Sequence, residues 1–484
     1  MTYPWWSMLP FVALLASIAI MPLARPTRHL WERASFQLGL ALALGLPVAA
    51  AVWVLDDPGR VVHALVEYGQ FIVLLLALFV VSGGLFLKGD IRATPRNNTI
   101  FLAIGGLAAS FIGTTGAAML LIRPLLNTNK ERRHKAHTVI FAIFVVANCG
   151  GLLTPLGDPP LFLGMLRGVP FTWTFTLLPE WLFVNALLLL SYYALDRRRF
   201  RAEDPDDVAH DIADVEPLGL RGGLNFLWFA VIVAAVAFAP SIDLHAIESG
   251  HAGAWAWVPV RELLMLAAAA ASYVATPRRV RFGDNEFSWG PIAEVAALFV
   301  GIFLTMIPAL AFLGQVAPRL PLNEVTFFLF TGGLSAVLDN APTYATFYEM
   351  ASQVPVPPGV ELIGTTPPVP ESFLVAISLG AVFCGALTYI GNGPNFMVKS
   401  VAESRGVEMP SFGGYVLWSF AYLGPILVAL LCLFIADGVL ATALGAAAAL
   451  FVVARAAFDL RASNTVDRLA PPVNQGSCTS ESTM

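Results

Sequence analysis

The chain has 484 residues, of which 57% are hydrophobic and only 13% are charged. Its mean hydropathy of +0.72 excludes an ordinary soluble protein. The net charge of −5 offers no basic face for nucleic acid. We therefore expect an all-α polytopic membrane protein that is surrounded by the lipid bilayer.

The first half of the chain, residues 1–195, contains several apolar runs long enough to cross a bilayer. They lie at residues 5–24, 35–55, 66–88, 137–166 and 171–195. The run 5–24 has neither a charged leader nor a small-residue cleavage site, so it is interpreted as a retained span. The stretch 100–126 is too long for one simple helix and has Gly113-Thr114-Thr115-Gly116 in its middle, which predicts a re-entrant hairpin.

Residues 196–221 are polar, with four arginines followed by an acidic stretch, and are predicted to form a cytoplasmic linker. A second repeat, 222–436, follows the linker. Its predicted spans are 222–241, 258–276, 290–315, 372–400 and 412–436. The stretch 322–350 has Asp339-Asn340-Ala341-Pro342 in its middle and predicts a second hairpin. An extra helix at 437–458 and a polar tail at 459–484 complete the chain.

Two related sequences interrupt the apolar runs 137–166 and 372–400. The first is TPLGDPPLF at Thr154–Phe162, and the second is TYIGNGPNF at Thr388–Phe396, 234 positions later. Backbone freed from helical pairing costs several kcal/mol per group in hydrocarbon, so it persists only inside protein or beside a wet cavity. Two broken helices, one in each half, therefore predict a binding site near the midplane of the membrane.

Lysine and arginine are expected in cytoplasmic loops, and they fit one orientation of the chain. With the N-terminus outside, the linker and most clusters of cations fall inside, whereas Arg60, Arg167 and Arg319 stand alone in outer loops. Each half then has five crossings and one hairpin, so the second half is inverted relative to the first. This inverted repeat places the C-terminus in the cytoplasm of a bacterium and the protein in its inner membrane.

Two carboxylates lie inside this predicted membrane region, where a charge costs roughly 2.5 to 3.5 kcal/mol. Asp158 is in the first break and Asp339 at the second hairpin tip, and the matching positions hold Asn392 and Thr114. Carboxylates with nearby amide and hydroxyl oxygens suit Na⁺, and a buried carboxylate can also take up a proton. A Na⁺ site at Asp158, Asp339 and Asn392 is therefore predicted. The alternative is that each aspartate only caps a helix, as Asp158 would before Pro159.

Other polar side chains beside the breaks and hairpin tips would either bind the ion or satisfy unwound backbone. These candidates are Asn340, Thr154, Thr388, Asn392, Asn395, Thr114 and Thr115. A further set is expected to allow the backbone geometry rather than to bind, and comprises Gly157, Gly391, Gly393, Pro159, Pro160 and Pro394.

Charged residues toward the ends of the spans form a third set of candidates. Arg123 and Lys399 would pair with a core carboxylate, face an anionic substrate, or simply pair at the interface. Glu294 and Glu349 are candidates for a proton path. The chain has neither H-E-x-x-H nor G-x-S-x-G, so we expect no enzyme and no catalytic residue.

The segments Gly150–Gly164, Leu334–Tyr344 and Gly385–Glu403 resemble the ion transporter superfamily, most closely its bacterial branch of citrate transporters and NhaD-like sodium:proton antiporters. The resemblance implies a homodimer whose scaffold helices make the dimer contact, while hairpins and broken helices move as an elevator. Carboxylate-transporting relatives carry Ser-Asn-Thr at each hairpin tip. This chain departs from that pattern, with an acidic group at Asp339.

These observations favour a secondary active transporter. The first hypothesis is a sodium/proton antiporter in which Asp158 and Asp339 bind Na⁺ and H⁺ alternately, with no cofactor beyond these transported ions. The alternative is a Na⁺- or H⁺-coupled transporter of citrate or another di- or tricarboxylate, with Arg123 or Lys399 and half-helix N-termini holding the anion.

Overall fold

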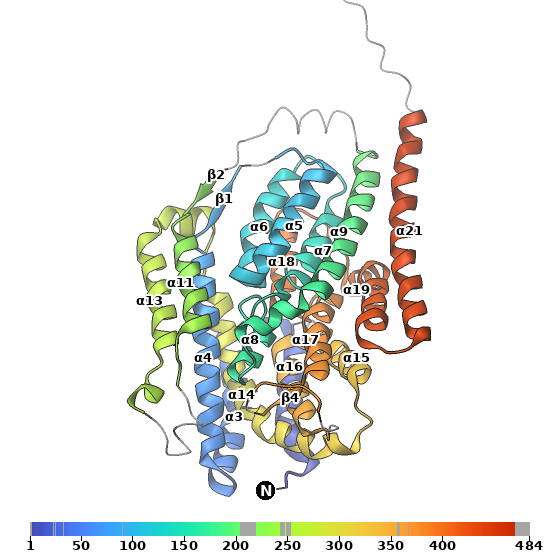
Figure 1. The fold of residues 1–484 in the computed structure, drawn as a ribbon. Coiled ribbons are helices and arrows are strands. Elements are labelled where there is room, and N and C mark those ends of the chain that lie inside the picture. The colour runs from blue at the N-terminus through green and yellow to red at the C-terminus, as the bar shows by residue number, and fades with distance from the viewer. Residues whose placement is uncertain are drawn as a thin grey trace, which may run out of the picture.

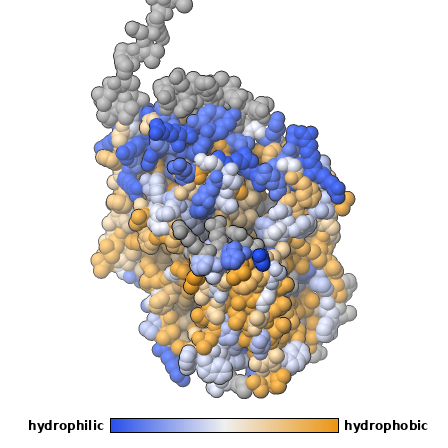
Figure 2. Space-filling model, turned by 180° about the vertical axis from the view of Figure 1, so that it is seen from behind, coloured by the Kyte–Doolittle hydropathy of each residue, from blue (hydrophilic) through white to orange (hydrophobic). Residues whose placement is uncertain are grey.

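The computed structural model describes residues 2–22, 24, 26–31, 33–89, 91–203, 219–242, 247, 253–355, 359–365 and 367–469. These residues are mostly helical, and five of their helices are long and apolar enough to cross a membrane, or six if one bent pair is counted. Figure 2 shows hydrophobic residues over much of one face, with hydrophilic residues gathered toward its upper end. The expected all-α polytopic membrane fold is confirmed.

One set of helices, here called the α14 group, packs together and draws on both halves of the chain. Its members are α1 (Leu9–Ile20), α3 (Ala34–Leu55), α4 (Pro58–Ser82), α11 (Asn225–Phe238), α13 (Val260–Ala275) and α14 (Gly290–Val316). Small residues let α3 and α14 approach closely, because a Cβ added to Gly301 would lie 2.7 Å from that of Ala41. Phe71 of α4 stacks on Phe299 of α14, with ring centroids 5.0 Å apart.

The other helices of seven or more residues, here called the α17 group, include those that flank the predicted hairpin tips and breaks. Its members are α5 (Pro95–Ile112), α6 (Thr114–Thr128), α7 (Ala136–Val145), α8 (Pro159–Leu166), α9 (Leu178–Phe200), α15 (Glu324–Ser335), α16 (Asn340–Gln353), α17 (Glu371–Cys384), α18 (Gly393–Ser404), α19 (Phe412–Tyr422), α20 (Gly424–Leu430) and α21 (Val439–Leu469). In Figure 1, α5, α6 and α18 lie in the upper part of the molecule, and α8, α15 and α16 in the lower part.

Helix boundaries within the α17 group follow local signals. Gly113, with a φ of 81°, separates α5 from α6, a conformation that favours glycine. Prolines occupy the first turns of α8 and α18, where their missing N–H groups cost nothing. Neither 153–158 nor 388–392 is helical. The re-entrant entry of the hairpins into a bilayer and the inversion of the two halves stay predictions.

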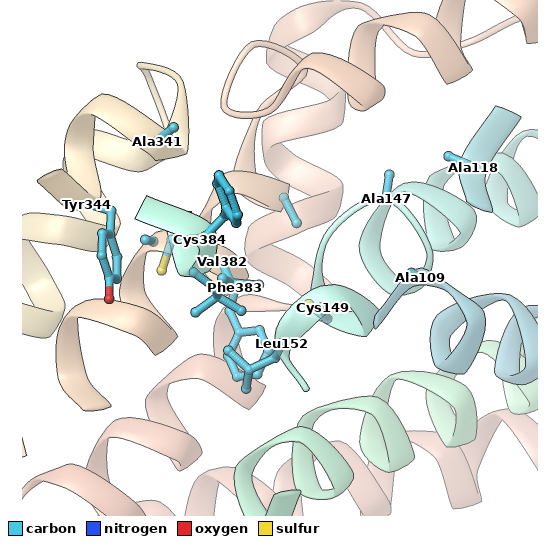
Figure 3. Close-up of a cluster of buried hydrophobic side chains, with 14 of the residues drawn as sticks. Ala109, Ala118, Ala147, Cys149, Leu152, Ala341, Tyr344, Val382, Phe383 and Cys384 are labelled. Carbon is cyan, nitrogen blue, oxygen red and sulfur yellow. The ribbon is translucent and has the colours of Figure 1, made fainter. Parts of the chain in front are cut away.

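Apolar side chains pack the two breaks against each other. Where α17 meets the short helix η2 (Cys149–Leu152), Figure 3 shows Leu152 of the first half beside Val382 and Phe383 of the second. Cys149 and Cys384 are both buried in this cluster as free thiols. Close packing accounts for small residues at these places.

Several shorter elements connect the helices. They are η1 (Trp5–Met8), α2 (Arg28–Trp31), η3 (Phe171–Leu177), η4 (Ala254–Trp257), η6 (Ala317–Arg319), η7 (Gly385–Leu387), and the π-helical turns Arg279–Asp284 and Leu431–Ile435. Two antiparallel strand pairs accompany them: β1 (Phe86–Lys88) with β2 (Gly219–Arg221), and β3 (Leu362–Ile363) with β4 (Val369–Pro370). The predicted span 412–436 is bent by 43° between α19 and α20.

Several boundaries differ from the sequence-based expectations, and three of these differences involve polar or buried groups. Helix α4 begins at Pro58, because Asp57 caps it by accepting a 2.8 Å hydrogen bond from Gly59. Helix α9 continues past Asp196, which is buried. Helix α21 extends into the predicted tail, where Asp459 pairs with Arg198 of α9 at 2.8 Å. Residues 204–218 of the predicted linker and 470–484 of the tail lie outside the described residues.

Candidate functional site

The carboxylate of Asp158 is fully buried and receives hydrogen bonds from both halves of the chain. Its Oδ1 accepts from Thr114 Oγ1 and from Asn392 Nδ2, each at 3.2 Å. Its Oδ2 accepts from Asn340 Nδ2 at 2.5 Å. Both predicted breaks and both predicted hairpin tips thus contribute one residue each to a single cluster, which we call the Asp158 cluster.

The N-terminal ends of four helices meet at this cluster. Thr114 and Asn340 are the first residues of α6 and α16, while Asp158 and Asn392 directly precede α8 and α18. Unpaired backbone N–H groups give a helix N-terminus a partial positive charge. The arrangement therefore favours a negative charge at this point, which Asp158 itself supplies.

Asp158 and Asp339 differ in whether their side chains cap a helix. Asp158 occupies the position before α8, yet its side chain makes no capping hydrogen bond with a described backbone N–H. Asp339 does cap its helix, since its Oδ1 accepts from Ala341 N at 3.1 Å. The carboxylate of Asp158 thus faces side chains of the cluster rather than its own helix.

A chain of hydrogen-bonded side-chain amides extends from the Asp158 carboxylate. Asn392 Nδ2 also lies 3.2 Å from Asn148 Oδ1, and Asn148 Nδ2 donates to Asn395 Oδ1 at 2.7 Å. Asn395 Nδ2 in turn donates to the carbonyls of Gly385 and Thr388 at 2.8 and 3.0 Å. Asn395 therefore satisfies the unwound backbone of the second break.

Thr154 and Thr388 play matching parts in the two halves. Thr154 Oγ1 donates to the carbonyl of Ser110 at the end of α5, and Thr388 Oγ1 donates to that of Ala336 after α15 at 2.5 Å. Each hydroxyl also accepts from the backbone N–H two residues later, at 3.1 and 3.2 Å. The two threonines thus tie each break to the hairpin of its own half and do not contact Asp158.

Sequence reasoning missed two serines that complete these ties. Ser110 Oγ donates to the carbonyl of Gly150, and Ser335 Oγ to that of Ala381, at 2.5 and 2.7 Å. Both serines lie shortly before a predicted hairpin tip, and this shared position is the signal that would have found them.

Close backbone approach explains two of the predicted glycines. A Cβ on Gly157 would collide with the carbonyl oxygen of Gly151, and one on Gly391 would lie 2.5 Å from that of Gly385. A Cβ on Gly393 meets no described atom within 4 Å, so this position has room for a side chain. Pro159, Pro160 and Pro394 begin α8 and α18.

A cavity of about 420 Å³ separates the Asp158 cluster from the α14 group. Its polar lining consists of Thr114, Thr115, Asn392, Asp339 and Glu294, and its other walls are largely apolar. Thr114 and Asn392 therefore contact both the cavity and Asp158. The half-buried Asp339 faces the cavity from the α17 group, and Glu294 faces it from α14.

The two predicted cationic partners are engaged elsewhere. Arg123 pairs with Glu286 at 3.1 Å and donates to the carbonyl of Asn285 at 2.8 Å. Lys399 pairs with Glu403 at 2.7 Å and lies over the ring of Tyr389. Among the described contacts of these two cations, none reaches the Asp158 cluster.

A helical membrane fold with broken helices around a buried carboxylate and an adjoining cavity is typical of membrane transporters. The chain belongs to the family described as "Putative citrate transport", whose model matches residues 1–435. This membership confirms the resemblance to citrate transporter-like proteins, and the protein is a membrane transporter.

Known relatives agree with this assignment. A protein of Mycobacterium bovis named uncharacterized transporter is 25% identical over 353 residues, which cover 70% of this chain and 75% of the relative. An uncharacterized transporter of Mycobacterium tuberculosis matches with the same identity and coverage. The 46 kDa membrane protein of Mycobacterium leprae is 26% identical over 357 residues, covering 69% of this chain and 74% of its own length.

Proposed function

We propose that the protein is a secondary active transporter that exchanges Na⁺ for H⁺ at Asp158. The observation that carries this proposal is that the buried carboxylate has only neutral side-chain partners among the described residues: Thr114, Asn340 and Asn392. A buried carboxylate without a cation is costly, and either H⁺ or Na⁺ neutralises it. Because one carboxylate does not hold both ions together, their competition couples the two fluxes.

Asn340 supplies a means of accepting Na⁺. Its Nδ2 donates to Asp158, while its buried Oδ1 has no partner among the described residues. Half a turn of the amide exchanges the two atoms, so that a donor to the carboxylate becomes an oxygen ligand. The hydroxyl of Thr114 offers another oxygen, and oxygen ligands of this kind suit a hard cation. Asp339 is the second proton- or Na⁺-binding carboxylate in this proposal.

Alternating access would come from movement of the α17 group against the α14 group, as the family resemblance implies. The cavity between the groups supports this, because it leaves part of the interface between them unpacked. The proposal includes a homodimer held by the α14 group, in a bacterial inner membrane with the N-terminus outside. The N-terminus and the C-terminal end of α21 lie at opposite ends of the molecule (Figure 1), which fits the proposal that they face opposite sides of the membrane.

The family description favours a second candidate, the uptake of citrate or another di- or tricarboxylate. Four helix N-termini at the Asp158 cluster are also suited to an anion. The lining of the cavity opposes this candidate, because its charged members are Asp339 and Glu294, and both repel an anion. Sodium/proton exchange is therefore the function that the site supports best.

Proteoliposomes that contain a pH-sensitive dye test the proposal. Addition of Na⁺ should move protons in the wild type, addition of K⁺ should have less effect, and Asp158→Asn should abolish the Na⁺ response. Glu408→Gln is the matched control, because Glu408 is an exposed glutamate outside the lining of the cavity, and it should respond like the wild type. Uptake of labelled citrate without any Na⁺-driven pH change would replace this proposal by the second candidate.

A further inference from the structure

The cavity beside the Asp158 cluster is far larger than a bare Na⁺ requires. It encloses about 420 Å³, whereas about 10 to 15 Å³ is already enough for one water molecule. Much of its wall comes from large apolar side chains of α4, α14 and α18, including Leu74, Leu78, Leu298, Phe299, Phe396 and Met397. Apolar walls give water few hydrogen-bond partners, so this space suits an apolar body better than a hydrated ion.

The charge of the lining has one sign. Asp339 and Glu294 are its charged members, and they face the cavity from the α17 and α14 groups respectively. Each carboxylate is held by a neutral donor: Asp339 by the N–H of Ala341 at 3.1 Å, and Glu294 by Gln37 Nε2 at 2.7 Å. Within the described residues, neither forms a salt bridge. The cavity thus combines apolar walls with two carboxyl groups that have no cationic partner in the part of the chain that the structure describes.

We propose that this cavity binds a hydrophobic monovalent organic cation as a transported substrate. The apolar body would fill the space between α4, α14 and α18, and its positive charge would lie near Asp339 and Glu294. Phe299 and Phe396 add aromatic faces that attract a cation. The inference rests on the proposed exchange at Asp158, and it names a second cargo that would bind in the cavity beside that carboxylate.

Two residues connect the cavity with the Asp158 carboxylate. Thr114 and Asn392 line the cavity and also donate to Asp158 Oδ1. A proton or Na⁺ on Asp158 changes the charge beside the cavity, and in a low-dielectric site this change is strongly felt. Occupation of Asp158 therefore weakens binding of the organic cation, which is the relation that an exchanger requires.

Binding of two probes of nearly equal size and opposite charge tests the proposal. Tetraphenylphosphonium is a cation and tetraphenylborate an anion, and each would be titrated into the full-length protein in nanodiscs, with empty nanodiscs as the blank. We expect saturable binding of tetraphenylphosphonium alone. Asp339→Asn and Glu294→Gln should each weaken it at least tenfold, while the control Glu408→Gln, at an exposed glutamate outside the lining, should leave it unchanged.

A second variant removes space without removing charge. Ile302→Trp places a bulky ring in the lining and should also abolish binding of the cation, while a retained thermal unfolding transition shows that the protein is folded. Equal binding of both probes would overturn the proposal in favour of a lipid tail in the cavity. Unchanged affinity in Asp339→Asn and Glu294→Gln would overturn it as well.

The Na⁺-driven pH response of the same preparations separates the two proposals. If the wild type shows a Na⁺-driven pH response but binds no tetraphenylphosphonium, the proposed organic-cation site is refuted and sodium/proton exchange still stands. A wild type that binds the cation but gives no Na⁺ response refutes sodium exchange at Asp158 and leaves the cation site standing.

Discussion

Asn340 donates a 2.5 Å hydrogen bond to Asp158, although the two residues are 182 positions apart in the chain. The donor is the first residue of α16, and the acceptor directly precedes α8. This contact joins the second predicted hairpin to the first predicted break. It is also the shortest of the three side-chain hydrogen bonds to the Asp158 carboxylate.

Asn340→Ala should weaken both Na⁺ binding and the fold. The substitution removes the donor to a buried carboxylate and the amide oxygen proposed as a ligand, so we expect a roughly tenfold rise in the Na⁺ concentration for half-maximal response. The free energy of unfolding should fall by about 1 to 3 kcal/mol. Asn97→Ala is the control, because Asn97 makes an exposed hydrogen bond to Arg92 O. Equal effects in both variants would contradict the assigned role.

Exchanging Asp158 and Asn392 should partly restore the transport that is lost in Asp158→Asn alone. Asp158→Asn alone is expected to lose the Na⁺-driven pH response. The double variant Asp158→Asn/Asn392→Asp keeps one carboxylate in the cluster, because the side chains of the two residues are only 3.2 Å apart. We expect it to regain a measurable part of the response in proteoliposomes. A double variant as inactive as the single one would show that the position of the carboxylate, and not only its charge, is essential.

Alanine substitutions should separate the glycines that allow close backbone approach from those that do not. Gly391→Ala places a Cβ 2.5 Å from the carbonyl oxygen of Gly385, and should destabilise the protein by about 3 kcal/mol through overpacking. Gly393→Ala, with no described atom within 4 Å of the new Cβ, should change stability little. Thermal unfolding of the two purified variants compares them directly, and similar transition temperatures would refute this account.

A buried ion pair away from the site should be important for stability. Asp196 is fully buried and lies 2.7 Å from the guanidinium of Arg132. Asp196→Asn leaves the buried cation without its main partner, which typically costs about 3 to 5 kcal/mol. Glu403→Gln breaks the more exposed pair with Lys399 and should cost less than about 1 kcal/mol. The difference between the two unfolding midpoints measures the effect of burial.

The sequence was sufficient to locate the segments that build the site, since at both breaks and both hairpin tips the polar or glycine- and proline-containing interruption of the apolar run coincides with a helix boundary. The same signals identified Asp158, Thr114, Asn340 and Asn392. They did not reveal which way each side chain faces. Thr154 and Thr388 lie in the same breaks, yet their hydroxyls bind backbone carbonyls of the hairpins.

Contacts between distant parts of the chain explain the remaining differences. Asp196 is polar and lies next to a run of arginines, so local composition placed it in a linker. Its partner Arg132 is far away in sequence, and their pairing lets α9 continue past Asp196 while burying the carboxylate. The extension of α21 has a similar cause in the pairing of Asp459 with Arg198. No local pattern contains this information.

The three donors to Asp158 are divided unequally between the halves of the chain. A polypeptide that ends at residue 203 retains the carboxylate and Thr114 but loses both asparagines. One that begins at residue 219 carries Asn340, Asn392 and the second carboxylate, Asp339, but lacks Asp158. Each piece would keep its apolar helices, yet neither would contain the complete Asp158 cluster. Two separately encoded halves would have to meet in the same bilayer before any exchange could begin.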